Sequence, residues 1–396
     1  MKQCWRWFGP ADTIKLETLH QAGVEGIVTA LHHIPPGHIW TDGDIRMRIE
    51  LLAAAGFTWD VVESLPVSEA IKTQSTDCHA HLAAYKQSLR NLAARGIGTV
   101  CYNFMPILDW TRTELQTPQP HGGTAMTFRL LDFSVFDIHL LKRRGAADDY
   151  SQAQQDAAQE RFQKLSSADK RSLQNNIVAG LPGANDNWTV DDVLAQLGTY
   201  RNIDANRLRQ NLIDFLAEIC PLAQDLGIRL CCHPDDPPFG LLGLPRVMSS
   251  QADYATIMNA VPMPTNGITF CTGSLGVAPE FDPVAFVSEL GSHIHFVHLR
   301  NTKRLTSTDY ARPDFFEAAH LEGDTDMVAT IKALTTEQSR RRTQGRTDCV
   351  IPMRPDHGQE LLTDLEANSM PGYPLVGRMR GLAELRGIMT AVAHKD

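Results

Sequence analysis

The stretch IRLCCHPDDPP, residues 228–238, joins an apolar run to a cluster of polar and turn-forming residues. A short apolar run with such a sharp end is typical of a buried strand. Two cysteines, a histidine and two aspartates, all potential metal ligands, stand where that strand must end. Whether this cluster carries chemistry depends on what the other predicted strands carry at their ends.

Seven further runs of the same kind occur along the chain. Together the predicted strands cover residues 4–9, 26–33, 58–64, 98–105, 228–234, 267–274, 294–301 and 349–357. Segments with helical spacing lie between them, and several close with a glycine in the C-cap position. This alternation predicts a parallel sheet covered by helices, and eight such units match a closed (β/α)₈ TIM barrel. A doubly wound open sheet is the alternative, but no GxGxxG turn follows the first strand.

Residues 110–200 interrupt the alternation. They separate the fourth and fifth predicted strands by far more chain than one crossover helix needs, and the run at 146–176, AADDYSQAQQDAAQERFQKLSSADKRSLQNN, has helical spacing. We therefore expect one barrel domain over residues 1–396, with a helical insertion at about 110–200. Its role stays open between a solvated excursion, an oligomer contact and a lid over the site.

Composition and charge favour a small-molecule partner. The formal net charge is −9 and the basic residues are dispersed apart from residues 339–346, so neither nucleic acid nor a membrane surface is an expected partner. The N-terminus has no apolar signal segment and no stretch is apolar enough to span a membrane, which predicts a cytoplasmic protein. Its eight cysteines are then expected to stay reduced.

The ends of the last four predicted strands each carry a credible metal ligand. The fifth strand ends at His233, the sixth at Cys271, the seventh at His298 and the eighth at Asp356. Taken singly, such a histidine or cysteine is more often a packing or hydrogen-bonding residue. In a TIM barrel, however, the carboxyl ends of the strands build the active site. The convergence therefore predicts a site for Zn²⁺, Fe²⁺, Co²⁺ or Mn²⁺, and its place on the open face favours a catalytic ion over a structural zinc.

Side-chain alternation separates these residues from their neighbours. Cys231 shares a strand face with His233 but lies deeper, which predicts packing inside the barrel, whereas Cys232 faces the helices. On the seventh strand, His293 and His295 are alternatives to the ligand named above, because strand ends often kink. His298 is favoured over both because it lies nearest to the carboxyl end of the strand.

Several other polar residues follow predicted strands. Asn103, Asp109, Trp110 and Arg112 come after the fourth strand, and most of them are expected to have structural roles such as capping. Arg300 and Arg354 can bind a substrate carboxylate through paired hydrogen bonds, or serve as salt-bridge partners within the barrel. Tyr373, in the loop beyond the eighth strand, is either a loop anchor or a proton donor.

Motifs along nearly the whole chain resemble the D-mannonate dehydratase family. In order, they are WRWFGP, GIVTALHHIPPG, YNFMPILDWTRT, CCHPDDPP, TFCTGSLG, HFVHLRN, RPDHG and PGYPLVGRMRGL. The resemblance implies a xylose-isomerase-like TIM barrel that removes water from D-mannonate to give 2-dehydro-3-deoxy-D-gluconate. It also implies that Mn²⁺ or Fe²⁺ is bound by His233, Cys271, His298 and Asp356, and that the catalytic pair is His357 and Tyr373.

The chemistry of dehydration explains the need for such a site. The reaction removes the C2 proton and expels the C3 hydroxyl, and the charge that develops beside the substrate carboxylate needs a cation in a site that excludes water. Histidine titrates near neutral pH, which favours His357 as the base and Tyr373 as the proton donor, although the reverse assignment stays open. Arg300, Asn103 and Arg354 are the expected substrate contacts.

Two other functions remain open at this point. A metal-dependent sugar isomerase or epimerase on the same barrel would use the ion to polarise a carbonyl while a base moves a proton. A non-catalytic metal or redox sensor would use Cys231, Cys232 and Cys271, and would need accessible thiols of low pKa. For the enzyme, we expect a sugar acid substrate and a homo-oligomer, most simply a dimer.

Overall fold

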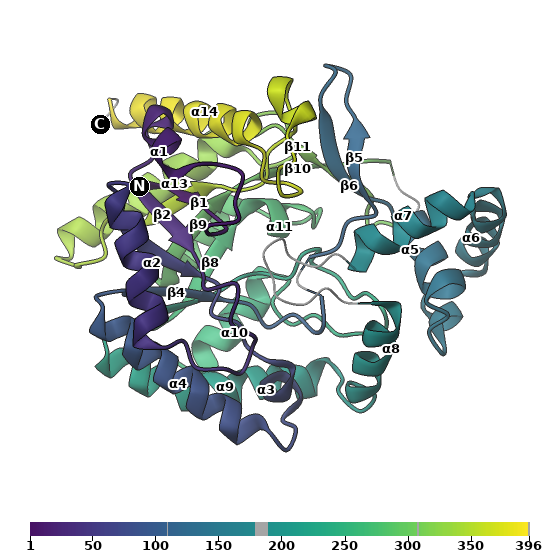
Figure 1. Ribbon diagram of the computed structural model, residues 1–396, viewed down its shortest axis with the longest axis horizontal. Helices are drawn as coiled ribbons and strands as arrows, with labels where there is room; N and C mark the ends of the chain where they lie inside the picture. The colour runs from purple at the N-terminus through teal and green to yellow at the C-terminus, as the bar shows by residue number, and fades with distance from the viewer. Residues whose placement is uncertain (109, 179–188, 307–308, 395–396) are drawn as a thin grey trace.

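The computed structural model describes residues 1–108, 110–178, 189–306 and 309–394. Eight parallel strands close into a barrel in the order β1-β12-β9-β8-β7-β4-β3-β2 (Figure 1). These strands are β1 (Lys2–Arg6), β2 (Gly26–Thr29), β3 (Trp59–Glu63), β4 (Thr99–Tyr102), β7 (Arg229–Cys232), β8 (Asn266–Cys271), β9 (Ile294–Leu299) and β12 (Pro352–Pro355). Each predicted strand overlaps one of them, so the TIM barrel prediction is confirmed.

Helices connect the barrel strands. They are α1 (Leu16–Leu19), α2 (Asp42–Ala54), α3 (Glu69–Thr73), α4 (Cys78–Ala94), α9 (Ala205–Asp225), α10 (Gln251–Ala260), α11 (Thr272–Gly276), α12 (Pro283–Leu290), α13 (Met327–Thr343) and α14 (Leu375–Ala393), with the short turns η1 (His20–Ala22), η4 (Gly291–His293) and η5 (Leu362–Glu366). α9 buries Leu208, Leu212, Phe215 and Ile219 along one face. This spacing of three and four residues is the signature of an amphipathic helix packed on a core.

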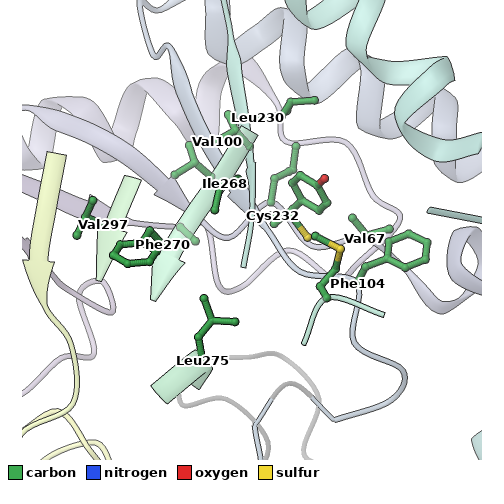
Figure 2. Close-up of a cluster of buried hydrophobic side chains, with 14 of the residues drawn as sticks. Val67, Val100, Phe104, Leu230, Cys232, Ile268, Phe270, Leu275 and Val297 are labelled. Carbon is green, nitrogen blue, oxygen red and sulfur yellow. The ribbon is translucent and has the colours of Figure 1, made fainter. Parts of the chain in front are cut away.

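Two apolar clusters hold the barrel together. The inner cluster takes one side chain from each of six strands: Cys4, Val28, Val61, Cys101, Cys231 and Phe296. A larger outer cluster includes Val100, Ile268 and Phe270, which Figure 2 shows close together. Cys232 belongs to the outer cluster and Cys231 to the inner one. The predicted opposite orientations of these two cysteines are confirmed.

The insertion at residues 110–200 is not purely helical. It contains α5 (Leu130–Val135), α6 (Gln152–Lys164), α7 (Ser167–Val178), α8 (Val190–Thr199), the short turns η2 (Phe136–Leu140) and η3 (Ala146–Asp149), and a hairpin of β5 (Glu114–Pro118) and β6 (Thr124–Phe128). Residues 179–188 of the insertion lie outside the described part. The helical prediction is therefore incomplete. An isolated hairpin of two such short strands is at best marginally stable, and its pairing partner β11 lies far away in the sequence.

A second sheet joins this insertion to the loop after β9. β6 pairs with β11 (Phe315–Ala318), which pairs with β10 (Asn301–Arg304), and the antiparallel order is β10-β11-β6-β5. Because β10 begins directly after the carboxyl end of β9, the sheet is attached to the rim where the active site of a TIM barrel lies. None of the helices in the described ranges is long and apolar enough to cross a membrane.

Candidate active site and metal centre

Three predicted ligands from neighbouring strands meet at the carboxyl end of the barrel. Nε2 of His233 lies 3.2 Å from Nδ1 of His298. The ligand atoms of His233, Cys271 and His298 all lie within 4.8 Å of one another. His295, the alternative on β9, is instead held by the carbonyl oxygen of Pro264. The strand order β9-β8-β7 explains the convergence, because it brings these three rim positions side by side.

Asp356, the fourth predicted ligand, lies beside this group. Its Oδ2 is 3.7 Å from Sγ of Cys271 and 3.8 Å from Nδ1 of His298, while its Oδ1 accepts a hydrogen bond from Arg354. Burial opposes ionisation of the carboxyl group, but Arg354 and neighbouring cationic groups hold the pKa of Asp356 well below its usual value. Asp356 can therefore offer a charged oxygen beside Cys271 and His298.

The partners of His233 and His298 outside the ligand group indicate which ring nitrogen of each histidine faces the other ligands. Nδ1 of His233 lies 2.7 Å from the carbonyl oxygen of Pro234 and donates to it, which leaves Nε2 free. Nε2 of His298 faces Oε2 of Glu63 at 3.5 Å, which turns Nδ1 toward His233, and Nη2 of Arg354 lies 3.5 Å from the same Nδ1. Partners of this kind orient metal-ligating histidines and select their tautomer. The two ring nitrogens that face each other are therefore Nε2 of His233 and Nδ1 of His298.

The donor set fits a divalent transition metal ion. Ligand atoms that each lie about 2.0–2.3 Å from one ion are roughly 3–4 Å apart, and the closest separations here, 3.2, 3.7 and 3.8 Å, fall in that range. Two imidazole nitrogens, one sulfur and one carboxylate oxygen suit borderline ions such as Mn²⁺, Fe²⁺, Co²⁺ and Zn²⁺. His233, Cys271 and His298 therefore have the chemistry and the mutual spacing that an ion at this point requires, and Asp356 lies within 3.8 Å of two of them.

His357 and Tyr373 line the cavity next to this group, together with Asn103, Trp110 and the two arginines predicted to contact substrate. The rings of His357 and Tyr373 meet edge to face, with centroids 5.0 Å apart. Gly372 makes this approach possible, because it has φ +80° and a Cβ there would lie 3.0 Å from Cδ2 of His357. Burial raises the pKa of Tyr373 to about 12. Tyr373 therefore keeps its proton at neutral pH.

A buried network of four arginines and four carboxylates surrounds the cavity. Its ion pairs join Arg6, Arg112, Arg300 and Arg354 to Glu63, Asp236, Glu317 and Asp356. Each of these side chains is at most 3% exposed. The four positive charges balance the four negative ones, which offsets the high cost of burying isolated charges. With a divalent ion and the Cys271 thiolate added, this network would carry one net positive charge.

The arginines predicted to contact substrate already have protein partners. Arg300 pairs with Asp236 and Glu317 at 2.7 Å each, and Arg354 pairs with Glu63 at 2.8 Å. Both line the cavity, so a substrate group can reach them, but neither is a free cation. Asn103 also lines the cavity, and its side chain has no hydrogen-bond partner within the described ranges. Asp109 lies outside those ranges.

The sequence prediction missed four charged residues of this network. Glu63 is the last residue of β3, so the rule applied to the later strands would have found it. Asp236 stands within the quoted HPDDPP segment, and Arg6 ends β1. Glu317 had no such signal, because it lies on β11 of the second sheet rather than on a barrel strand.

Burial argues against the sensor function. Cys231, Cys232 and Cys271 are all 0% exposed, and burial raises the pKa of the Cys232 thiol well above its ordinary value. A thiol sensor needs accessible sulfur atoms of lowered pKa. Two of these three cysteines are packing residues of the two apolar clusters.

Known proteins resemble this chain over its whole length. The sequence pattern of the D-mannonate dehydratase (UxuA) family matches residues 1–396. Mannonate dehydratase 1 of Agrobacterium fabrum is 52% identical over 394 residues, which cover 100% of this chain and 98% of the relative. The crystal structure of mannonate dehydratase from Streptococcus suis serotype 2 superposes with a TM-score of 0.77 at 31% identity, covering 100% of this chain and 94% of the other.

A more distant solved structure shares the fold alone. The xylose isomerase domain protein from Planctomyces limnophilus gives a TM-score of 0.51 at 11% identity, over 99% of this chain and 97% of the other. The two chains thus share the TIM-barrel fold. The full-length family match and the high identity to named relatives are more specific than this likeness. The chain therefore belongs to the D-mannonate dehydratase family of hydro-lyases.

Proposed function

We propose that the protein catalyses the metal-dependent dehydration of D-mannonate to 2-dehydro-3-deoxy-D-gluconate, with His357 and Tyr373 as the proton-transfer pair. The observation that carries the proposal is the group of His233, Cys271 and His298, of which His233 lines the same cavity as these two residues. When bound there with Asp356 as a further ligand, a divalent ion would supply positive charge to the substrate carboxylate and the adjacent hydroxyl.

The charge balance of the site supports an anionic substrate. The four arginines and four carboxylates of the network cancel one another, so a divalent ion and one thiolate would add a net positive charge to it. A sugar acid carries one negative charge and would neutralise it. Asn103, Arg300 and Arg354 line the cavity and are the proposed polar contacts for the substrate.

His357 and Tyr373 each carry out one proton transfer of the dehydration. His357 takes the proton from C2, and the electron pair of that C–H bond forms the C2–C3 double bond. The C3–O bond breaks, and Tyr373 gives its proton to the departing hydroxide, which leaves as water. The resulting enol takes up a proton at C3 and releases the proton of its C2 hydroxyl to solvent, which gives the 2-keto product; the proton taken by His357 and the one given by Tyr373 are likewise exchanged with solvent. The raised pKa of Tyr373, about 12, suits a residue that must hold its proton until the bond breaks.

The test is product analysis with controlled metal content. The purified protein should convert D-mannonate to a 2-keto-3-deoxy acid lighter by one water, lose this activity after chelation and regain it when Mn²⁺ is added. A product of unchanged mass would favour the isomerase or epimerase, which moves a proton without losing water. Formation of neither product would reject the proposed function.

Three finer points belong to the same proposal. We assign Mn²⁺ or Fe²⁺ as the working ion, because the mixed nitrogen, sulfur and oxygen set suits both. Metal analysis of protein purified without added metal tests this assignment. We also propose a homodimer that works in the cytoplasm. Light scattering of the purified protein tests whether it is a dimer, and cell fractionation tests whether it is cytoplasmic.

A further inference from the structure

Glu317 reaches the active site from outside the barrel. It lies on β11, where its backbone is opposite Thr302 of β10, and its side chain is 1% exposed. β11 is held against the insertion by pairing between Phe315 and Phe128 of β6, and these two rings stack with centroids 5.6 Å apart. The second sheet therefore carries one carboxylate to the rim of the barrel.

Two arginines fix the position and charge of this carboxylate. Arg300 donates to Oε2 from Nε at 2.7 Å and to Oε1 from Nη2 at 2.9 Å. Arg112, at the start of the insertion, donates to Oε1 from Nη2 at 2.7 Å. Burial opposes ionisation, but the two guanidinium groups hold the pKa of Glu317 at about 2. An ionised carboxylate accepts hydrogen bonds and cannot donate one.

His357 is the third partner of Glu317. Nδ1 of His357 lies 3.2 Å from Oε1 of Glu317, so the proton of this hydrogen bond must belong to the histidine. The other ring nitrogen, Nε2, lies 4.0 Å from the nearest oxygen of Asp356, which is too far for a hydrogen bond. No other described residue bonds to Nε2, and His357 lines the cavity.

We infer that Glu317 is a positioning residue that holds His357 in the Nδ1–H tautomer, so that Nε2 is the atom that exchanges a proton with the substrate. The inference rests on the proposed role of His357 in dehydration. It also gives the insertion and the second sheet a function. Arg112 and β6 belong to the insertion, and together they hold Glu317 where it meets the imidazole ring.

If Glu317 had a purely structural role, a different result would be expected. Asp236 is the control residue that distinguishes the structural role from the positioning role. Asp236 pairs with the same two arginines, at 2.9 Å to Arg112 and 2.7 Å to Arg300, but it makes no contact with His357 within the described ranges. If Glu317 serves only to neutralise the arginines, Glu317→Gln and Asp236→Asn should have similar effects. If it orients His357, only Glu317→Gln should alter the imidazole.

The direct test is nitrogen NMR of the full chain labelled with ¹⁵N-histidine and loaded with diamagnetic Zn²⁺, which this donor set suits. The His357 signals are identified among those of 15 histidines by their loss in His357→Asn. We expect the Nδ1–H tautomer in the wild type and in Asp236→Asn, and a shift toward Nε2–H in Glu317→Gln, because the amide oxygen that Arg112 and Arg300 hold at this position is a weaker acceptor for Nδ1–H than the carboxylate. An Nε2–H tautomer in the wild type would overturn the inference even if neither Glu317→Gln nor Asp236→Asn folds.

Kinetics supply the second readout. Glu317→Gln should bind metal normally and keep KM within a few-fold of Asp236→Asn, while its kcat falls on the order of 100-fold or more below that control, as when a histidine base loses its orienting carboxylate. Equal kcat values for the two variants would contradict the inference. Failure of the wild type to form the 2-keto-3-deoxy product would instead reject the proposed function, and the NMR comparison would still decide the tautomer.

Discussion

At the scale of single residues, the role of His357 needs the strictest test, because this histidine stands next to a proposed metal ligand. Substituting it must separate proton transfer from metal binding. We expect His357→Asn to bind as much Mn²⁺ as the wild type and to lose turnover, since asparagine fills a similar space but does not accept a proton near neutral pH. Metal analysis and an activity assay on the same preparation check this. Full activity in the variant would reject His357 as part of the proton-transfer pair.

Glu63 is expected to act on the metal through His298 rather than by direct contact. Its Oε2 faces Nε2 of His298 at 3.5 Å, and it also pairs with Arg6 and Arg354. Loss of such an outer partner typically weakens metal binding by about 10–100-fold. We predict that Glu63→Gln raises the dissociation constant for Mn²⁺ by that factor in a calorimetric titration.

The matched control for Glu63→Gln is Asp60→Asn. Asp60 lies on the same strand, β3, but pairs with Lys2 near the opposite end of the barrel. This variant should bind Mn²⁺ as the wild type does. Equal affinities for the two variants and the wild type would show that Glu63 does not orient His298.

At the scale of elements, the loop between β12 and α14 depends on Gly372. An alanine there would adopt φ near +80° and would place Cβ 2.5 Å from Met126 and 3.0 Å from His357. Gly96 has φ +78°, and a Cβ there would have no other atom within 4 Å. Both alanine variants should therefore lose about 1–2 kcal/mol of unfolding free energy from backbone strain. Only Gly372→Ala should also displace His357 and lower kcat.

Chemical unfolding and steady-state kinetics on the pair check this prediction. Gly96→Ala is expected to keep the kcat of the wild type, because it lies in the turn after α4, away from the cavity lining. If Gly372→Ala also kept full kcat while losing stability, the close approach of the loop to His357 would have no role in catalysis.

The elements also explain how far the sequence could predict the site. Barrel strands are recognised from local runs of apolar residues, and all their carboxyl ends meet at one rim, so His233, Cys271 and His298 could be grouped without coordinates. Glu317 could not, because β11 is a short strand whose pairing partner β6 lies in a distant part of the chain. No local period marks such a contact, and one of the arginine partners of Glu317, Arg112, is 205 residues away in sequence.

At the scale of the whole molecule, buried neutral histidines link stability to pH. Burial lowers the pKa of His295 to about 3, of His32 to about 3 and of His320 to about 4. The unfolded chain binds a proton at each histidine near pH 6.5, whereas the folded chain does not until the pH is far lower. Each residue therefore contributes stability that is complete above pH 6.5 and is lost as the pH falls from there toward 3 or 4.

His295 offers the cleanest test, because it lies at the amino end of β9, opposite the metal group, and its Nε2 bonds to the carbonyl oxygen of Pro264 at 3.1 Å. Glutamine can keep that bond but does not titrate. Lowering the pH from 7 to 5 should cost the wild type about 2 kcal/mol through His295, a loss that His295→Gln does not share. The stability gap between the two proteins, measured by urea unfolding, should narrow by that amount. If the unfolding free energies of the wild type and His295→Gln changed equally with pH, His295 would be protonated as readily in the folded chain as in the unfolded one.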